Sequence, residues 1–487
     1  MKEFLPILIL LAVIGVVFLR LPKVDLGHSK KFLRRRVGNW LPLGLTYAFL
    51  YMGRYNVTVS QNAFGDILNE GVPLMTNGDF ATIFFWGTAT YGTSFVINGP
   101  LTDRIGGRKA ILLGAGGSLI MNAAMGVITM LAVANPASSV AQNLTIIFSV
   151  LYAMNMYFQS FGAVAIVKCN APWFHVRERG VFGAIFGVLI SLGVYFAFDW
   201  GYKVLENFGL DAVFFVPAAI LVVCWVIVFV QVRDTPVLAG FDDFDPEDAS
   251  SGDDGPQLGA KEVFIKMARN PIIMTIACVE FCSGFLRQAI MQWFRTFAKQ
   301  TDSVLHLKDS FVYDNWGMLL CCAGILGGVV AGIISDRVFQ SRRGPVAAIL
   351  YAGMGISAVV LAFVYATPVV GWLVVFMSMA VIGVHGMLSG TASMDFGGRK
   401  NVGVAVGIID GFVYAGTAVM SMTYGFLLPD DTNAEFAADP ANWISWPVAM
   451  IPMALIGFVL ATRLWNAKPK KASEEAAEQD KTKPATV

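Results

Sequence analysis

The chain has 487 residues, of which 56% are hydrophobic and only 14% are charged, and it contains 37 phenylalanines. A soluble protein has about 25% charged residues, so a water-soluble fold of this size would leave too much apolar surface exposed. The net charge of +1 excludes the strongly basic surface typical of nucleic-acid binding, so we expect no nucleic-acid partner. The composition instead predicts an all-α polytopic membrane protein.

The six cysteines give no sign of a metal site or a disulfide framework. All of them lie in apolar stretches, without paired Cys-x-x-Cys spacing and without a histidine at ligand distance. The sequence also contains no phosphate-binding glycine loop and no pattern typical of a catalytic triad. We therefore expect no metal, no cofactor and no enzymatic activity.

Apolar runs of about 20 residues recur along the chain, and each is long enough to cross about 30 Å of hydrocarbon. Thirteen membrane spans are predicted. They cover residues 3–20, 40–62, 80–101, 110–133, 143–173, 181–204, 211–232, 271–299, 311–334, 346–366, 370–392, 402–428 and 444–465.

The spacing of these spans predicts five regions. Two six-helix bundles at 40–232 and 271–465 form the core, preceded by an extra helix and a basic linker at 1–39. The segment 233–270 between the bundles is acidic, is interrupted by proline and glycine, and has no helical period in its middle, which favours a solvated linker. The tail at 466–487, rich in Lys, Glu and Ala, is predicted to be disordered.

The first span sets the predicted orientation. Before it stands only Lys2, which Glu3 cancels, whereas seven lysines and arginines follow it. By the positive-inside rule these cations hold the linker in the cytoplasm, so we expect the N-terminus outside and the C-terminus in the cytoplasm of a cell with this protein in its inner or plasma membrane. A cleaved signal peptide is the alternative for such a short run. The seven cations are Arg20, Lys23, Lys30, Lys31, Arg34, Arg35 and Arg36.

Four cationic side chains are predicted at membrane depth: Arg54, Lys168, Arg287 and Arg295. Charged residues are costly there and mark functional sites by default. Arg54 and Arg287 are 233 positions apart, at corresponding places in the first helix of each bundle. Arg295 lies two helical turns beyond Arg287, towards the outside. Two roles are equally open for it: a cation in the outer vestibule of the cavity, or a side chain that extends to the membrane surface.

Two loops repeat the spacing of 233 residues. Each places Gly-x-x-x-Asp-Arg at the end of a predicted span, with more cations a few positions later. Halves related in this way face each other across a central cavity, where the two arginines are expected to converge. The repeated acid-base order predicts a gating motif, and a loop that only fixes orientation is the alternative. The motif comprises Gly99, Asp103, Arg104 and Arg108 in the first half, and Gly332, Asp336 and Arg337 in the second.

The sequence Gly-x-Leu-x-Asp-Arg-x-Gly-Gly-Arg-Lys at 99–109, after the second of twelve core spans, resembles the signature loop of the major facilitator superfamily. Other motifs are similar to those of its organophosphate:phosphate antiporter family, and together they cover about residues 40–465. They are Tyr51-Met-Gly-Arg54-Tyr-Asn56, Phe285-Leu-Arg287 followed by Trp293, residues 335–345, and residues 407–416 with Tyr414. The resemblance implies two six-helix bundles in the major facilitator fold, to which this chain adds its first helix.

In that family two arginines, one in each half, bind the phosphate moiety of the substrate, and by position these are Arg54 and Arg287. Lys168 stands where relatives often have a basic residue, whereas Phe95 and Pro172 replace basic residues that relatives often carry. The resemblance implies a monomeric secondary transporter that exchanges an organophosphate, of the sugar phosphate or glycerol phosphate type, for inorganic phosphate by alternating access.

Arginine suits this task because its guanidinium stays charged in a desolvated site and contacts phosphate through two nitrogens. The alternative is an internal ion pair with Glu280 or Asp410. Further polar residues are candidates to line the cavity, although such residues more often serve in helix packing. They are Tyr51, Asn56, Tyr91, Gln159, Gln288, Trp293 and Tyr414.

Two other functions remain open at this point. One is a proton- or cation-coupled symporter of another organic anion, in which Glu280, Asp410 and His385 take coupling roles. The other is a sensor that binds sugar phosphate without transporting it and offers the extra first helix to a partner. Phosphate-driven counterflow separates these functions.

Overall fold

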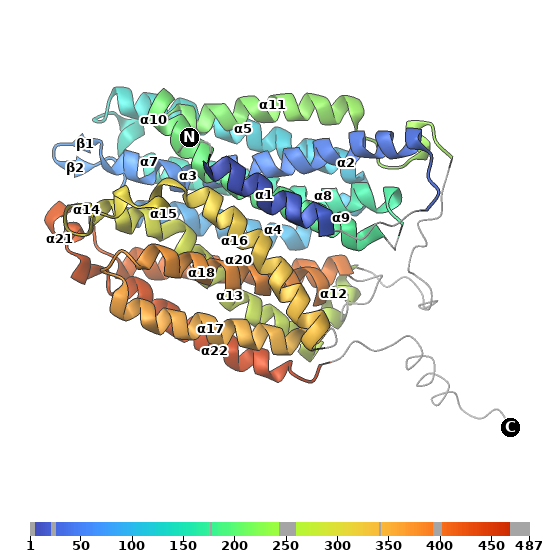
Figure 1. Cartoon of the computed structure of the whole chain (residues 1–487). Helices are drawn as coiled ribbons and strands as arrows, with labels where there is room; N and C mark the ends of the chain where they lie inside the picture. Colours follow the sequence, from blue (N-terminus) through green and yellow to red (C-terminus); the bar gives the residue numbers. More distant parts are fainter. Residues whose placement is uncertain are drawn as a thin grey trace.

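The computed structural model describes residues 5–20, 26–175, 178–242, 260–339, 342–392 and 402–467. This part is helical apart from one two-stranded hairpin, β1 (Leu68–Asn69) and β2 (Val72–Pro73). The hairpin lies at one end of the elongated bundle, which we call the hairpin end, and α12 (Ala260–Ala268) lies at the other, which we call the linker end (Figure 1).

The first half of the chain forms one bundle. Within it α4 and α5 pack against α7, α11 packs against α5, and α2 packs against α9 and α11. Its helices are α2 (Lys30–Leu50), α3 (Met52–Gly65), α4 (Asn77–Ile105), α5 (Gly107–Ala134), α6 (Ser139–Gln142), α7 (Leu144–Gln159), α8 (Phe161–Asn170), α9 (Arg179–Tyr195), α10 (Gly201–Phe208) and α11 (Ala212–Gln231).

The second half repeats this arrangement, with α13 packed against α20 and α22, α17 against α22, and α16 against α18. Its long helices are α13 (Pro271–Gln300), α16 (Trp316–Ile333), α17 (Arg343–Val364), α18 (Val370–His385), α20 (Val402–Leu427) and α22 (Ser445–Arg463). Its short helices α14 (Asp302–Leu305), α15 (Phe311–Asp314) and α21 (Ala434–Ala438) connect them.

The halves meet along two seams, α4 with α20 and α9 with α16. In Figure 1 the first half is the upper layer and the second half the lower layer, and α1 (Leu5–Arg20) crosses between them. Leu10 of α1 is buried in a cluster with Val188 of α9 and Cys321 of α16. The extra helix therefore covers the second seam and contacts both halves.

Ten helices within the described ranges are long and apolar enough to cross a membrane, and they correspond to ten of the thirteen predicted spans. The remaining three predicted spans correspond to α4, to α2 with α3, and to α1, whose apolar stretch is only Ile7–Val17. The prediction of an all-α polytopic membrane protein is confirmed, and the first span stays a prediction.

Two details differ from the predicted boundaries. The predicted span 40–62 is broken at Tyr51, where the main-chain nitrogen donates to the carbonyl of Ala48 instead of continuing the α-helical pattern. The predicted linker 233–270 ends in helix α12, because residues 260–268 supply an apolar face of Phe264, Ile265 and Met267 between charged positions. The acidic middle of that linker, residues 243–259, lies outside the described residues.

Candidate functional site

Arg54 is buried in the middle of the molecule, on the first turn of α3. Its Nη2 donates to the hydroxyl of Tyr91 at 2.8 Å, and its Nε donates to Oε1 of Gln159 at 3.1 Å. Its Nη1 reaches across the seam to the hydroxyl of Tyr414 on α20 at 3.3 Å. Every one of these partners is neutral, so the hydrogen bonds are satisfied while no carboxylate of the described residues pairs with the positive charge.

Aromatic rings surround the same guanidinium. The Cζ atom of Arg54 lies 4.5 Å from the ring centre of Tyr51 and 4.6 Å from that of Tyr91. The rings of Tyr91 and Tyr414 lie 4.3 Å apart and join the two halves. Cation–π attraction compensates part of the desolvation cost of the buried cation, but it leaves the net charge unchanged.

Arg287 occupies the corresponding position on α13. Its Nε is buried and has no hydrogen-bond partner among the described residues. Tyr414 and Tyr55 lie within electrostatic range of its guanidinium. A buried donor without a partner costs free energy, so Arg287 is poised to bind an acceptor that enters the space between the halves.

The carboxylates expected as alternative partners of the arginines bond elsewhere. Oε2 of Glu280 lies 2.8 Å from Nδ1 of His385, and Asp410 accepts a hydrogen bond from the hydroxyl of Ser389. The structure therefore brings Glu280 and His385 together. Both carboxylates remain within electrostatic range of Arg287, but neither forms an ion pair with it among the described residues.

Residues related by the internal repeat touch each other. Tyr55 follows Arg54 and Gln288 follows Arg287, so these neighbours are also 233 positions apart, and Nε2 of Gln288 donates to the hydroxyl of Tyr55 at 2.9 Å. Two repeat-related residues make direct contact only near the pseudo-twofold axis. Arg54 and Arg287 therefore flank that axis. Tyr55 was not among the predicted site residues, although the repeat spacing identifies it once Gln288 is considered.

Other predicted lining residues lie away from the arginines. The amide of Asn56 donates to Asn122 inside the first half, so this residue packs helices there. The ring of Trp293 lies 6.1 Å from that of Tyr424 within the second half, and its Nε1 has no partner among the described residues. Lys168 is exposed on α8. It lies nine residues beyond Gln159, the partner of Arg54, which is about 13 Å along a helix.

Polar contacts between the halves continue to the hairpin end. The side-chain amide of Asn77 donates to Gln300 at 3.1 Å and to the carbonyl of Pro429 at 3.2 Å. Lys299 pairs with Asp66, which is again 233 positions away. These bonds hold the two halves together at the hairpin end, outside the membrane spans.

Two more groups take part in this closure. The main-chain nitrogen of Asn77 donates to Asp431 at 2.8 Å. Burial raises the pKa of the Asp431 carboxyl, against the opposing effect of that hydrogen bond. Arg295 is sandwiched between the rings of Tyr202 in the first half and Tyr313 in the second, with its Cζ 3.4 and 3.8 Å from their centres. Arg295 thus joins the two halves of the protein and does not extend to the membrane surface.

The predicted gating motif lies at the linker end. Arg104 and Arg337 are exposed, and Gly99 has open space beside it. The side chains of Asp103 and Asp336 lie outside the described residues, so the expected latch stays a prediction.

Asp234 caps the helix after the first motif loop. The main-chain nitrogen of Arg108 donates to Oδ1 of Asp234 at 2.7 Å, and the guanidinium of Arg108 donates to the carbonyl of Phe229. The chain turns here at Gly106, whose φ of 90° favours glycine. Asp234 was not predicted, because its distance of 126 positions from Arg108 gives no local signal.

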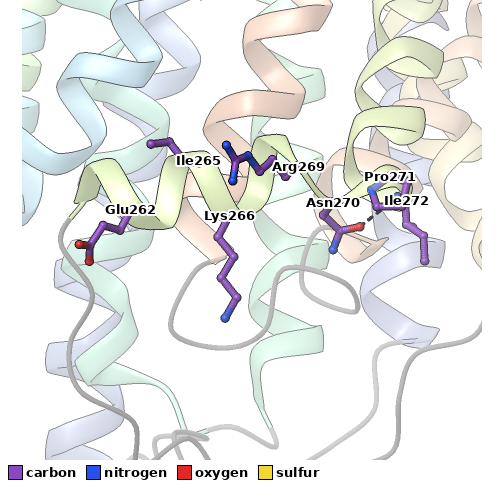
Figure 2. A pocket seen from close by; sticks show the side chains of 7 residues that line it. All are labelled: Glu262, Ile265, Lys266, Arg269, Asn270, Pro271 and Ile272. Carbon is purple, nitrogen blue, oxygen red and sulfur yellow. Dashed lines mark hydrogen bonds between the residues drawn. The ribbon is translucent and has the colours of Figure 1, made fainter.

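An open hollow lies at the linker end, and neither Arg54 nor Arg287 lines it (Figure 2). It is formed by α12 and the start of α13, where Asn270 caps α13 by accepting from the nitrogen of Ile272 at 3.0 Å. Its lining residues are Glu262, Ile265, Lys266, Arg269, Asn270, Pro271 and Ile272.

Two helical bundles that enclose buried cations at their interface define a membrane transport protein of the secondary transporter class. The sequence pattern of the Major Facilitator Superfamily matches residues 43–421, and the chain belongs to this superfamily. Its members are transporters, so the prediction that the chain is not an enzyme is confirmed.

Several named proteins are similar to this chain and indicate one family within the superfamily. The glycerol-3-phosphate transporter of Bacillus subtilis is 27% identical over 77% of this chain and 81% of its own length. The membrane sensor protein UhpC of Salmonella typhimurium is 25% identical over 82% and 86%, and a probable hexose phosphate transport protein of Chlamydia pneumoniae is 22% identical over 92% and 95%. The predicted likeness to the organophosphate:phosphate antiporter family is confirmed.

A solved structure agrees with the fold. The bacterial homologue of the human lysosomal transporter Spinster, in an inward-facing and unoccupied conformation, superposes with a TM-score of 0.69 over 91% of this chain and 100% of its own. The sequence identity is 14%, so this likeness concerns the fold alone.

Proposed function

We propose that the protein exchanges an organophosphate, of the sugar phosphate or glycerol phosphate type, for inorganic phosphate across the inner or plasma membrane. The observation that carries this proposal is the pair of arginines beside the pseudo-twofold axis, the buried Arg54 and the half-buried Arg287. Arg54 has only neutral partners, and the Nε of Arg287 has none among the described residues. The names of the glycerol-3-phosphate and hexose phosphate relatives support the same class of substrate.

Charge balance explains the choice of ligand. A phosphate ester or inorganic phosphate carries about 1.5 to 2 negative charges near neutral pH, which matches two guanidinium groups. The hydroxyls of Tyr91 and Tyr414 accept from Arg54 and keep their own protons available for phosphate oxygens. Phosphate thus supplies anionic acceptors for the guanidinium groups of Arg54 and Arg287.

Alternating access follows from the contacts between the halves. We place the linker end in the cytoplasm, because the basic first linker and the cationic loops lie there. The closed hairpin end then faces outward, with the N-terminus outside and the C-terminus inside. The protein acts as a monomer whose two halves rock, with Asp103 and Asp336 as latches, and this motion exposes the arginines to each side in turn.

Phosphate counterflow in proteoliposomes tests the site. Lysine keeps the charge but loses the two-pronged contact, so Arg54→Lys and Arg287→Lys should each slow exchange well over tenfold, which corresponds to about 2–5 kcal/mol for a buried charge pair. Arg463→Lys, an exposed change at the end of α22, is the matched control. Robust exchange by the Arg54→Lys, Arg287→Lys double variant would refute the proposed site.

Sensing without transport is the second candidate, because relatives named as membrane sensor proteins match 82% to 92% of the chain. A sensor would bind inorganic phosphate through the same arginines and show no counterflow. Equilibrium binding measured together with counterflow on the same preparation therefore separates the two functions.

A further inference from the structure

The second half contains a buried acidic cluster that the phosphate site does not use. Glu280 of α13 is fully buried, with Oε2 2.8 Å from Nδ1 of His385 and with Oε1 lacking any partner in the described part of the chain. His385, at the end of α18, keeps 26% of its side chain exposed. One face of the pair is thus enclosed, and the other reaches the surface of the protein.

A second carboxylate belongs to the same cluster. Asp410 of α20 accepts from Ser389, and its electrostatic neighbours are His385, Glu280 and Arg287. Two ionised carboxylates and one guanidinium leave one uncompensated negative charge when the imidazole is neutral. A single proton on the Glu280–His385 pair restores neutrality, and burial favours the neutral state.

Among the described residues, one cation is identified beside the pair. The titratable side chains that interact electrostatically with Glu280 or Asp410 there include Cys282 and Arg287 of α13, Tyr351 of α17 and His385 of α18. The hydroxyl of Tyr351 is occupied, because it donates to the carbonyl of Val279 at 2.6 Å. Arg287 is therefore the fixed positive charge on which the balance depends.

Phosphate binding changes this balance. When a phosphate engages Arg287, the charge that compensated Glu280 and Asp410 is neutralised by the ligand, so the cluster binds its proton more tightly. By linkage, the proton in turn strengthens phosphate binding by the same factor. Glu280 and Arg287 are seven positions apart on α13, two helical turns on one face, which places the two sites close enough for this coupling.

We propose that Glu280 and His385 form a proton-binding site, and that one proton is taken up and released together with the phosphate held by Arg287. The proton enters from the solution on one side, resides on the pair while the halves rock, and leaves to the opposite solution with the phosphate. This inference rests on the proposed phosphate site and specifies its coupling ion.

The test uses the full-length protein in proteoliposomes loaded with glycerol 3-phosphate as the counter-substrate and with the membrane potential clamped. Inorganic phosphate is the probe, and the outside is one pH unit more acidic than the inside. Each coupled proton adds about a tenfold accumulation of phosphate per pH unit. Exchange at equal pH is measured on the same vesicles, and the ratio of gradient-driven uptake to exchange corrects for the amount of active protein.

Glu280→Gln preserves shape and resembles the protonated carboxyl, so it removes the response to the gradient more than it removes exchange. The ratio should fall at least about fivefold, out of the tenfold factor that one proton supplies. His385→Gln should lower it in the same direction and serves as the second variant if the first fails to fold. Glu435→Gln, the same chemical change at an exposed position of α21, is the matched control and should leave the ratio at the wild-type value.

Two results overturn the inference in distinguishable ways. An unchanged ratio in both variants would show that the titration of phosphate itself, and not the Glu280–His385 pair, carries the coupling. Absence of any counterflow by the wild-type protein would refute the proposed phosphate exchange, and the proton site as stated would fall with it.

Discussion

At the scale of single residues, the site depends on how Arg54 is held. Its guanidinium is buried and donates to Tyr91, Gln159 and Tyr414, so the group is oriented before a ligand arrives. Pre-orientation lowers the entropy cost of binding, because the long side chain has already lost its rotamer freedom. Tyr91 makes the shortest of these bonds, at 2.8 Å.

Tyr91→Phe should therefore weaken phosphate binding. The change removes one acceptor for Arg54 and one hydroxyl that can donate to phosphate, while the ring that faces the guanidinium remains. A lost hydrogen bond of about 0.5–1.5 kcal/mol raises the half-saturating phosphate concentration about two- to tenfold. Initial rates of counterflow at increasing external phosphate measure this value. Tyr365→Phe, at the end of α17, is the control, and equal half-saturation in both variants would contradict the role given to Tyr91.

At the scale of helices, α13 and α20 approach so closely at two glycines that no side chain fits there. A methyl group on Gly284 of α13 would overlap the main-chain carbonyl of Val413, and one on Gly416 of α20 would overlap that of Phe281. Small residues allow such approach in membrane helices, where packing replaces the hydrophobic effect as the driving force. The contact fixes the position of Tyr414, which follows Val413 and bonds to Arg54.

Gly284→Ala should consequently destabilise the second half. Because the obstructing atom belongs to the main chain, the two helices have to separate, at a cost of about 1–3 kcal/mol. Thermal unfolding in detergent measures the loss. Gly353→Ala on α17 adds the same methyl group where nothing lies within 4 Å, so it should leave the melting temperature unchanged or raise it slightly. A similar melting temperature for both variants would show that α13 and α20 do not pack as described.

The sequence determined the depth of the key residues along their helices, because hydropathy places the spans and the 233-residue repeat aligns Arg54 with Arg287. It did not determine how the helices are rotated. Tyr55 and Asn56 are adjacent on α3, yet one contacts Gln288 across the axis and the other contacts Asn122 within the first half. A helix with polar residues on several faces gives no periodic signal for this choice.

Contacts between residues on distant helices could not be predicted from the sequence either. Glu280 and His385 are 105 positions apart, and only the packed helices show that they form a pair. The sequence identifies both as candidate coupling groups, so their chemistry was predictable and their contact was not. The same limit applied to Arg295, which the structure places between two tyrosines from opposite halves.

At the scale of the whole molecule, the described contacts hold the hairpin end closed. Asn77 bonds to Gln300 and Pro429 of the other half, and Asp199 accepts from the main-chain nitrogens of Gly317 and Met318 at 2.6 and 2.9 Å. Any state that exposes Arg54 and Arg287 through this end has to break these bonds. Their strength therefore sets the population of such a state.

Asn77→Ala should shift this balance towards opening at the hairpin end. The change removes three side-chain hydrogen bonds between the halves, at about 1 kcal/mol each, so the open population should rise about tenfold or more. The reporter is Gln292→Cys, a buried position on α13 between Arg287 and Arg295, in a background without the six native cysteines. A membrane-impermeant maleimide added outside intact cells measures its accessibility.

Asn69→Ala is the matched control, because its amide donates to Pro136 within the first half, also at the hairpin end. Faster labelling with Asn77→Ala and not with Asn69→Ala supports a rocking motion gated at this end, whereas equal rates for the two variants would mean that these inter-half bonds do not control access to the arginines.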